Sequence, residues 1–219
     1  RAEVKSVFID IHAHAYRWSS PPWRGKPWFS TPEQLLARHE ELGIEQAVLL
    51  PLVNPEVYLP QSNEEILHIV DEFPGRFIPF CNVDPRALTN SADAPLGDLL
   101  RHYRDRGCRG VGEVMPNLPF LDPLVQNLFR HCQDTGLPLT FDISTRIGGT
   151  YGLYDDAGLP QLARSLQRFP RLIILGHGPA FWAEIAALET PADRAGYPGY
   201  PVREEGIVPK LFRRYPNLY

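Results

Sequence analysis

Cysteine is scarce in this chain, and so are the patterns that mark secreted or membrane proteins. Its 219 residues contain three cysteines, and no two of them form a Cys-x-x-Cys pair. So few and so scattered thiols favour reduced cysteines over a disulfide framework. No stretch approaches the roughly 18 consecutive apolar residues of a membrane span, and the opening residues RAEVKS lack the apolar segment of a signal peptide. These absences predict a cytoplasmic protein that does not enter a membrane.

Clusters of positive charge are also absent. The formal net charge is −4, and the lysines and arginines are scattered along the chain. A nucleic-acid partner is therefore not expected, because such partners require a basic stripe or patch. The chain also lacks the Gly-x-Ser-x-Gly turn of serine hydrolases and a glycine-rich phosphate loop. A small-molecule substrate is the expected partner.

The sequence does contain a regular alternation of short apolar runs and amphipathic segments. Apolar runs of strand length cover residues 7–11, 46–53, 76–83, 110–115, 137–143 and 172–176, and a last one begins at Asn217. Apolar residues recur every three or four positions in the segments 31–43, 62–75, 95–107, 122–136 and 158–170. The first pattern predicts buried strands and the second predicts helices that cover them.

This alternation limits the fold to two architectures. Nearly continuous apolar strands are typical of parallel sheets, and right-handed β–α crossovers leave a (β/α)8 TIM barrel or an open doubly wound sheet. No Gly-x-Gly-x-x-Gly follows the first strand, which disfavours a dinucleotide-binding sheet. A complete barrel needs about 250 residues. We therefore predict that residues 1–219 form one α/β domain, a TIM barrel truncated before its last strands. An open sheet of six or seven strands is the alternative.

Polar residues follow several of the predicted strands, at the end where the active sites of TIM barrels lie. In chain order they are Asp10, His12, His14, Glu113, Asp142 and His177. Residues i and i+2 of a strand share a face, so His12 and His14 project together. Imidazole and carboxylate groups gathered at one rim indicate a divalent metal, with Zn²⁺ as the first expectation and Mn²⁺ or Fe²⁺ as alternatives. The remaining histidines fall in helical segments, where we expect them to pack or to face solvent.

Four stretches carry a resemblance to a known family. They are IDIHAH at the first strand, GVGEV at the fourth, IILGHGPAFW at the sixth and RYPNLY before the seventh. In this order they resemble the amidohydrolase superfamily, and within it the amidohydrolase-related branch that contains the aminocarboxymuconate-semialdehyde decarboxylases. The resemblance implies that His12, His14 and His177 lie at or beside a metal. It also implies a metal-binding Asp after strand eight, beyond Tyr219.

The sequence departs from the family pattern at two places. Asp142 stands where the resemblance implies a histidine after strand five, so its contact with the metal is left open. Relatives with two metals often bridge them by a carboxylated lysine, but Lys5, Lys26 and Lys210 all lie away from predicted strand ends. Glu113 matches the bridging Glu of the superfamily's metal-dependent deoxyribonucleases, which keeps two metals possible. One metal is the preferred interpretation.

The metal centre and the resemblance together predict an enzyme. We expect a metal-dependent hydrolase that activates water to attack an amide, lactone or ester-like carbonyl. The metal ligands are assigned as His12, His14, Glu113 and His177, and the catalytic residues as Glu113, Asp142 and His177. Asp10 is expected to orient the ring of a ligating histidine. A decarboxylase of unsaturated or aromatic carboxylic acids is the alternative. A degenerate barrel that only binds a ligand is the second alternative.

Three long connections leave the same rim, at residues 15–29, 144–158 and 179–206. They are rich in Gly, Pro and aromatic residues, and such connections are usually lids or binding loops. We predict that Trp18 and Trp182 contact an apolar or ring-bearing part of the substrate and that Arg146 holds a carboxylate. Packing of these loops against one another, or against a second copy of the chain in a homo-oligomer, is the alternative.

Overall fold

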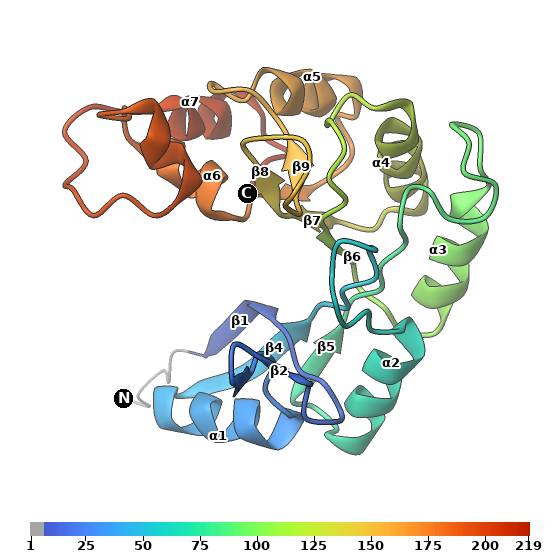
Figure 1. Ribbon diagram of the computed structural model, residues 1–219. Helices are drawn as coiled ribbons and strands as arrows, with labels where there is room; N and C mark the ends of the chain where they lie inside the picture. The colour runs from blue at the N-terminus through green and yellow to red at the C-terminus, as the bar shows by residue number, and fades with distance from the viewer. Residues whose placement is uncertain (1–6) are drawn as a thin grey trace, which may run out of the picture.

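The computed structural model describes residues 7–219, and Figure 1 shows an arc of strands with helices on its outer side. The principal strands are β1 (Phe8–Ala13), β4 (Ile44–Leu49), β5 (Phe77–Pro79), β6 (Val111–Val114), β7 (Leu139–Phe141) and β10 (Ile174–Leu175). The outer helices are α1 (Pro32–Leu42), α2 (Asn63–Glu72), α3 (Leu96–Asp105), α4 (Pro123–Thr135) and α5 (Pro160–Arg168). The predicted α/β alternation is confirmed.

The strands form two three-stranded parallel sheets, in the orders β1-β4-β5 and β10-β7-β6. We call these the first and second sheets. A parallel bridge between Cys81 and Val111 joins them, and another between Ile174 and Leu218 lies at the far end. Within residues 7–219 no pairing joins β1 to Leu218, so the strands of this part of the chain do not close into a barrel.

Capping residues that can be recognised in the sequence fix the ends of several helices. Thr31 caps α1 by accepting a hydrogen bond from the backbone N–H of Gln34, whose side chain accepts from the Thr31 N–H in return. Pro32 occupies the first turn, and Gly43 ends the helix at a φ of 70°. Asp122, Pro123 and Gly136 delimit α4 in the same manner.

The three long connections contain short elements that the sequence pattern does not predict. The first includes the hairpin β2 (Pro22–Trp23) and β3 (Lys26–Pro27), and the second pairs β8 (Ile143–Ser144) with β9 (Leu153–Tyr154). The third contains α6 (Pro179–Trp182), η1 (Ala183–Ile185) and η2 (Pro191–Ala195), and α7 (Ile207–Arg214) follows it.

Apolar packing is concentrated around the second sheet. Its strands and helices α3, α4, α5 and α7 share one large buried cluster, whereas β1 and β4 pack with α1 and α2 in a smaller one. All three cysteines are free, as the sequence predicts, and all three are buried. None of the helices in residues 7–219 is long and apolar enough to cross a membrane. Lys5, one of the three lysines that the sequence places away from strand ends, lies outside the described residues.

Candidate metal centre

The two histidines of the opening motif converge because β1 is irregular where they lie. Asp10 pairs with Ala47 and Ala13 pairs with Leu49. Between these two pairs β1 contains one residue more than β4, which is a β-bulge. Such a bulge re-aims the side chains next to it. The Nε2 atoms of His12 and His14 lie 3.2 Å apart, with the ring planes at 79°. The predicted projection of both imidazoles to one place is therefore observed.

A backbone carbonyl fixes the ring of His14. Its Nδ1 lies 2.8 Å from the carbonyl oxygen of Leu50, the residue that follows β4. Because a carbonyl can only accept, Nδ1 donates this hydrogen bond, which leaves Nε2 to face the other members of the cluster. Nε2, the atom that a bound metal would contact, points toward His12 and Glu113.

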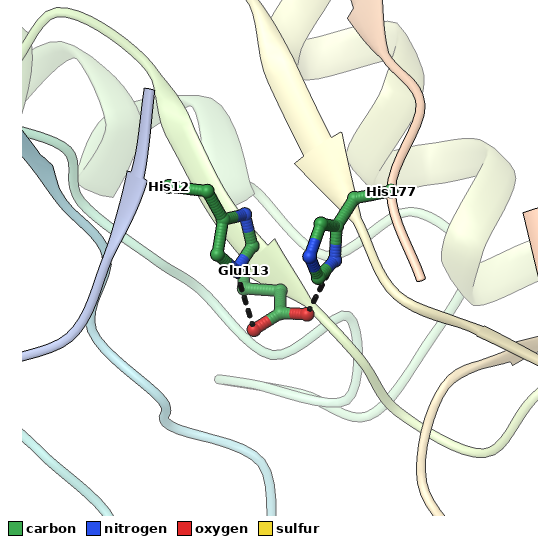
Figure 2. A group of neighbouring side chains, drawn as sticks. All are labelled: His12, Glu113 and His177. Atoms are coloured by element: carbon green, nitrogen blue, oxygen red, sulfur yellow. Dashed lines mark ion pairs between the residues drawn. The ribbon is translucent and has the colours of Figure 1, made fainter. Parts of the chain in front are cut away.

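Glu113 lies at the centre of the site, on β6, and is only 3% exposed. The pairing of β6 with β7 contains a similar bulge. Val111 pairs with Leu139 and Val114 with Phe141, so β6 has one extra residue between the two pairs. Oε2 of Glu113 lies 3.4 Å from Nε2 of His12 and 3.2 Å from Nε2 of His14. Figure 2 shows its carboxylate below the stacked rings of His12 and His177, with one oxygen facing each ring.

His177 follows β10 and completes the cluster from the second sheet. Its Nδ1 lies 3.2 Å from Oε1 of Glu113, and its ring stacks on that of His12 with centroids 3.6 Å apart. Gly178 lets the chain turn here: its φ is 97°, and a Cβ at this position would lie 2.2 Å from Oδ1 of Asp142. A larger residue at position 178 would displace either His177 or Asp142.

The charges in this cluster are strongly coupled. Burial raises the pKa of Glu113, but the three surrounding histidines outweigh it and bring the pKa well below its usual range. Burial lowers the pKa of His12. For His177 burial acts in the same direction, but the Glu113 carboxylate outweighs it and raises the pKa. Burial and the neighbouring Glu113 charge raise the pKa of Asp142 to about 7.

The donor set suits a divalent metal. One ligand atom each from His12, Glu113 and His177 lies within 4.8 Å of the others. Oε1 of Glu113 and Nδ1 of His177 are buried, and neither makes a hydrogen bond. A cation bound among these atoms would satisfy both, and imidazole with carboxylate is the ligand chemistry of Zn²⁺ and Mn²⁺ sites. The residues present fit the metal that the sequence predicts.

Asp10 does not orient a histidine of the cluster, so that prediction is wrong. Its Oδ1 accepts a hydrogen bond from the backbone N–H of His12, at 2.9 Å, and its Oδ2 lies 3.3 Å from Nε2 of the buried His39 on α1. The bulge turns the Asp10 side chain toward the covering helix. Its link to the site is through the His12 backbone.

Asp142 lies beside the cluster, between β7 and β8, and is buried. Its Oδ1 accepts from the backbone N–H of Ile143 at 2.5 Å. It is absent from the group of atoms that could hold one ion within the described residues. Its assignment as a catalytic residue stays a prediction, and its position next to Glu113 and His177 agrees with that role.

A cavity of about 820 Å³ opens above these residues. Its polar floor is formed by His12, His14, Glu113, Asp142 and His177, and its walls include Trp23, Trp28, Phe29, Tyr58 and Tyr151. Trp23 and Tyr58 stack with centroids 5.6 Å apart, and Phe29 and Tyr58 with centroids 6.3 Å apart. The floor is thus charged and the wall aromatic.

None of the three predicted substrate-binding residues lines this cavity. Trp18 is 78% exposed, and Trp182 packs against Phe181 and Phe212. Arg146 lines a separate, smaller cavity of about 270 Å³ that shares Asp142, Thr150 and Tyr151 with the large one. Substrate contact by these three residues stays an untested prediction. The opening loop does reach the cavity, but through Trp23, Trp28 and Phe29.

Sequence reasoning missed the wall residues Glu56, Val57 and Tyr58. They lie in the connection between β4 and α2, which follows the same rim as the other loops. A signal for them exists in the sequence, because 54–60 is an irregular, proline-containing stretch directly after a strand. No chemistry-bearing motif distinguishes it from an ordinary turn.

Comparison with known proteins identifies relatives of this arrangement. Residues 9–219 match the sequence model of the Amidohydrolase family. The structure is similar to 5-carboxyvanillate decarboxylase from Sphingomonas paucimobilis, with 16% identity and a TM-score of 0.56 over 97% of this chain and 79% of that one. It is also similar to the 5-carboxyvanillate decarboxylase of Novosphingobium aromaticivorans complexed with manganese, with 16% identity and a TM-score of 0.55 over 78% and 65% of the two chains.

A third similar structure is a TIM-barrel protein from Bordetella bronchiseptica, with 17% identity and a TM-score of 0.55 over 86% of this chain. This chain spans 58% of the length of that protein. No curated protein sequence matches significantly. At these identities the likeness of the solved structures concerns the fold.

Proposed function

We propose a function from the premise that this chain belongs to the amidohydrolase family, whose model covers residues 9–219. The predicted resemblance to this family is confirmed. We propose that the protein is a metal-dependent hydrolase of an amide, lactone or ester-like carbonyl. Its metal would be held by His12, His14, Glu113 and His177, with Zn²⁺ or Mn²⁺ as the bound ion.

One observation carries this proposal. Four side chains from β1, β6 and the end of β10 bring imidazole nitrogens and carboxylate oxygens together, and two of these buried atoms, Oε1 of Glu113 and Nδ1 of His177, face each other at 3.2 Å and make no hydrogen bond. Buried polar atoms that make no hydrogen bond are unfavourable for folding, and in native proteins they often mark a catalytic or ion-binding site. A bound divalent cation supplies that use, and it would add a Lewis acid that polarises a carbonyl group and acidifies water.

The chain's own residues would perform the remaining steps. The stack of His12 on His177 fixes the two rings that face Glu113. Asp142, with a pKa of about 7, can either take a proton or give one near neutral pH, which general acid–base catalysis requires. We propose that it takes a proton from the attacking water and returns it to the leaving group. The aromatic wall would exclude water and hold the apolar part of the substrate.

A decarboxylase is the second candidate, and the aromatic wall favours it. Trp23, Trp28 and Tyr58 line the same cavity as the charged residues, which suits a planar acid whose carboxylate faces the metal. Two solved structures of similar fold are 5-carboxyvanillate decarboxylases. In this case a protonated Asp142 would deliver its proton to the carbon that loses CO₂.

Metal analysis followed by a substrate screen tests both candidates. The protein, purified without chelator, is expected to contain about one equivalent of a divalent metal per chain, and His12→Ala and His177→Ala are each expected to lower that content. Hydrolysis is then assayed on aryl esters and lactones, and CO₂ release on hydroxybenzoic acids. Full metal occupancy in both variants would remove the proposed site. A loaded protein that turns over neither class would leave the ligand-binding alternative as the function.

A further inference from the structure

Asn82 follows β5 at the rim that carries the cluster, and its side chain is almost completely buried, at 2% exposure. The side-chain nitrogen donates two hydrogen bonds. One goes to the carbonyl oxygen of Pro51 at 2.9 Å, and the other to the carbonyl oxygen of Glu113 at 2.6 Å. A single amide group therefore joins two strand ends that belong to different sheets.

Both partners belong to backbone that holds members of the cluster. Pro51 directly follows Leu50, whose carbonyl fixes the Nδ1 proton of His14. The other carbonyl belongs to Glu113 itself, whose carboxylate lies 3.2 Å from Nε2 of His14. The bridge through Asn82 thus joins the backbone of Glu113 to the backbone beside Leu50, which holds the ring of His14, and so acts on the two residues that meet at side-chain level. It would limit how far they can separate.

A second asparagine holds the bridge in place. Oδ1 of Asn63, the first residue of α2, accepts from the backbone N–H of Asn82 at 2.7 Å, and Nδ2 of Asn63 donates to the Asn82 carbonyl at 3.0 Å. Asn63 is also buried. This reciprocal pair fixes the Asn82 backbone to a helix outside the sheet, so the amide cannot follow a shift of either strand end.

The orientation of the Asn82 amide follows from its partners. Both are carbonyl oxygens, so only the nitrogen can face them. Its Oδ1 is buried and has no hydrogen-bond partner within the described residues. Retaining a buried, unpaired oxygen is unfavourable for folding. The residue is therefore used for its two donors, which an aspartate of the same shape would lack.

We propose that Asn82 is a positioning residue that sets the spacing between His14 and Glu113 and thereby the geometry of the metal centre. This inference rests on the proposed metal-dependent function. Partners that orient metal ligands typically change metal affinity by about 10- to 100-fold when they are removed. Asn82 acts in this sense through backbone carbonyls and touches no ligand atom.

The test compares Asn82→Asp with Asn217→Asp. Asn217 is a matched control because it is also buried and its Nδ2 donates to the carbonyls of Leu166, Phe169 and Leu172, which carry no ligand. Both substitutions replace an amide NH₂, with its two N–H donors, by a carboxylate. An added negative charge near the site would by itself strengthen cation binding, so weaker binding of Asn82→Asp reports lost positioning.

The first measurement is Mn²⁺ affinity, by competition with a chelator, on folded protein. Asn82→Asp is expected to bind Mn²⁺ at least about tenfold more weakly than wild type, and Asn217→Asp to match wild type within about twofold while losing similar stability in urea. Asn63→Ala, which introduces no charge, is expected to weaken binding in the same direction and replaces Asn82→Asp if that variant does not fold. Unchanged Mn²⁺ affinity in the folded Asn82 or Asn63 variant would overturn the proposal.

The second measurement needs no metal. In the metal-free protein, the imidazole ¹⁵N signals of His14 are expected to shift in Asn82→Asp and to stay in place in Asn217→Asp. If wild type binds neither Mn²⁺ nor Zn²⁺, the proposed metal-dependent function fails, and these signals alone decide on Asn82. Identical imidazole spectra for all three proteins would then contradict its positioning role.

Discussion

The two sheets meet at the candidate site but differ in how they are held. On β1 of the first sheet, Phe8 and Ile11 are 58% and 59% exposed, although both are large and apolar. In the second sheet, Val111, Leu139 and Phe141 are completely buried. The first sheet contributes His12 and His14, and the second contributes Glu113 and, after β10, His177.

This difference separates two ways of fixing a functional side chain. Packing on both faces holds the strand that carries Glu113. Hydrogen bonds hold the histidines of β1: the Leu50 carbonyl fixes the His14 ring, and Asp10 fixes the His12 backbone. A weakly packed strand can therefore supply ligands when a bulge and a few specific hydrogen bonds replace the missing core.

The largest expected effect is a difference between the two sheets in how much stability is lost when a large apolar side chain is removed. Phe141→Ala should lower the free energy of unfolding by about 3–5 kcal/mol, because its ring packs edge-to-face on Phe120 and Phe181 in the fully buried cluster. Ile11→Ala should cost less than about 1 kcal/mol, because its side chain lies mostly in solvent. Urea denaturation of both variants measures the difference. Equal losses would show that the exposed face of β1 is covered in solution.

The next largest effect concerns Glu113, the residue of the second sheet that contacts both histidines of the first sheet. Glu113→Gln keeps the shape of the side chain but removes the charge that faces His12, His14 and His177. Metal affinity should fall by about 100-fold or more, beyond the range for residues that only support ligands. Isothermal titration with Mn²⁺ provides the measurement, with Glu33→Gln on the exposed start of α1 as control. An affinity within threefold of wild type would place the ion elsewhere.

A smaller expected effect is that folding stability depends on pH in opposite directions in the N-terminal and C-terminal halves of the chain. Burial raises the pKa of Asp155, in the second half, to about 6. The folded state then holds its proton where the unfolded state, near 3.8, has released it, so this residue reduces stability as pH rises from about 4 to 6. The contribution of Asp155 to the slope should approach about 1.4 kcal/mol per pH unit, and the slope of Asp155→Asn should differ from that of wild type by this amount. Urea unfolding at several pH values measures it, and any constant loss in the variant cancels in the slope.

Asp84, in the N-terminal half, is expected to change folding stability with pH in the direction opposite to Asp155. Burial raises its pKa, but the Arg86 guanidinium and the Asn54 amide outweigh it and lower the pKa below 3.8. Its stabilising contribution is therefore complete above pH 3.8 and disappears as the pH falls below that value. Asp84→Asn should flatten the pH dependence only in this acidic range. A change in slope between pH 4 and 6 would contradict the assignment.

The smallest effect tests which tryptophans of the opening loop face the substrate. Trp28 lines the cavity, whereas Trp18 does not. Trp28→Ala should raise KM for a ring-bearing substrate about fivefold, equivalent to about 1 kcal/mol of aromatic contact. Trp18→Ala should leave KM unchanged. Steady-state kinetics on both variants decides between them, and the reverse ranking would restore Trp18 as the contact.

Much of the fold was predictable because its signals are local. The apolar runs and the caps at Thr31 and Asp122 depend on neighbouring residues, and the structure places strands and helices there. The helix α7 was missed because Pro209 interrupts its pattern. The separation of β7 from β8 at Asp142 depends on pairing with β9, which no local pattern encodes.

The members of the cluster were predictable, but their surroundings were not. A polar residue that ends an apolar strand is visible in the sequence, and His12, His14, Glu113 and His177 do meet. The bulges next to His12 and Glu113 arise from pairing with neighbouring strands, so the outward turn of Asp10 toward His39 could not be foreseen. The wall at Tyr58 likewise depends on how distant loops pack.

We propose that one divalent ion joins the two sheets, with His12, Glu113 and His177 among its ligands. Anomalous diffraction at the manganese edge, from crystals grown with Mn²⁺, tests it directly. The account predicts a single strong peak among these three side chains, within coordination distance of each. A structure with no peak there, or with the His12 ring turned away from His177, would contradict it.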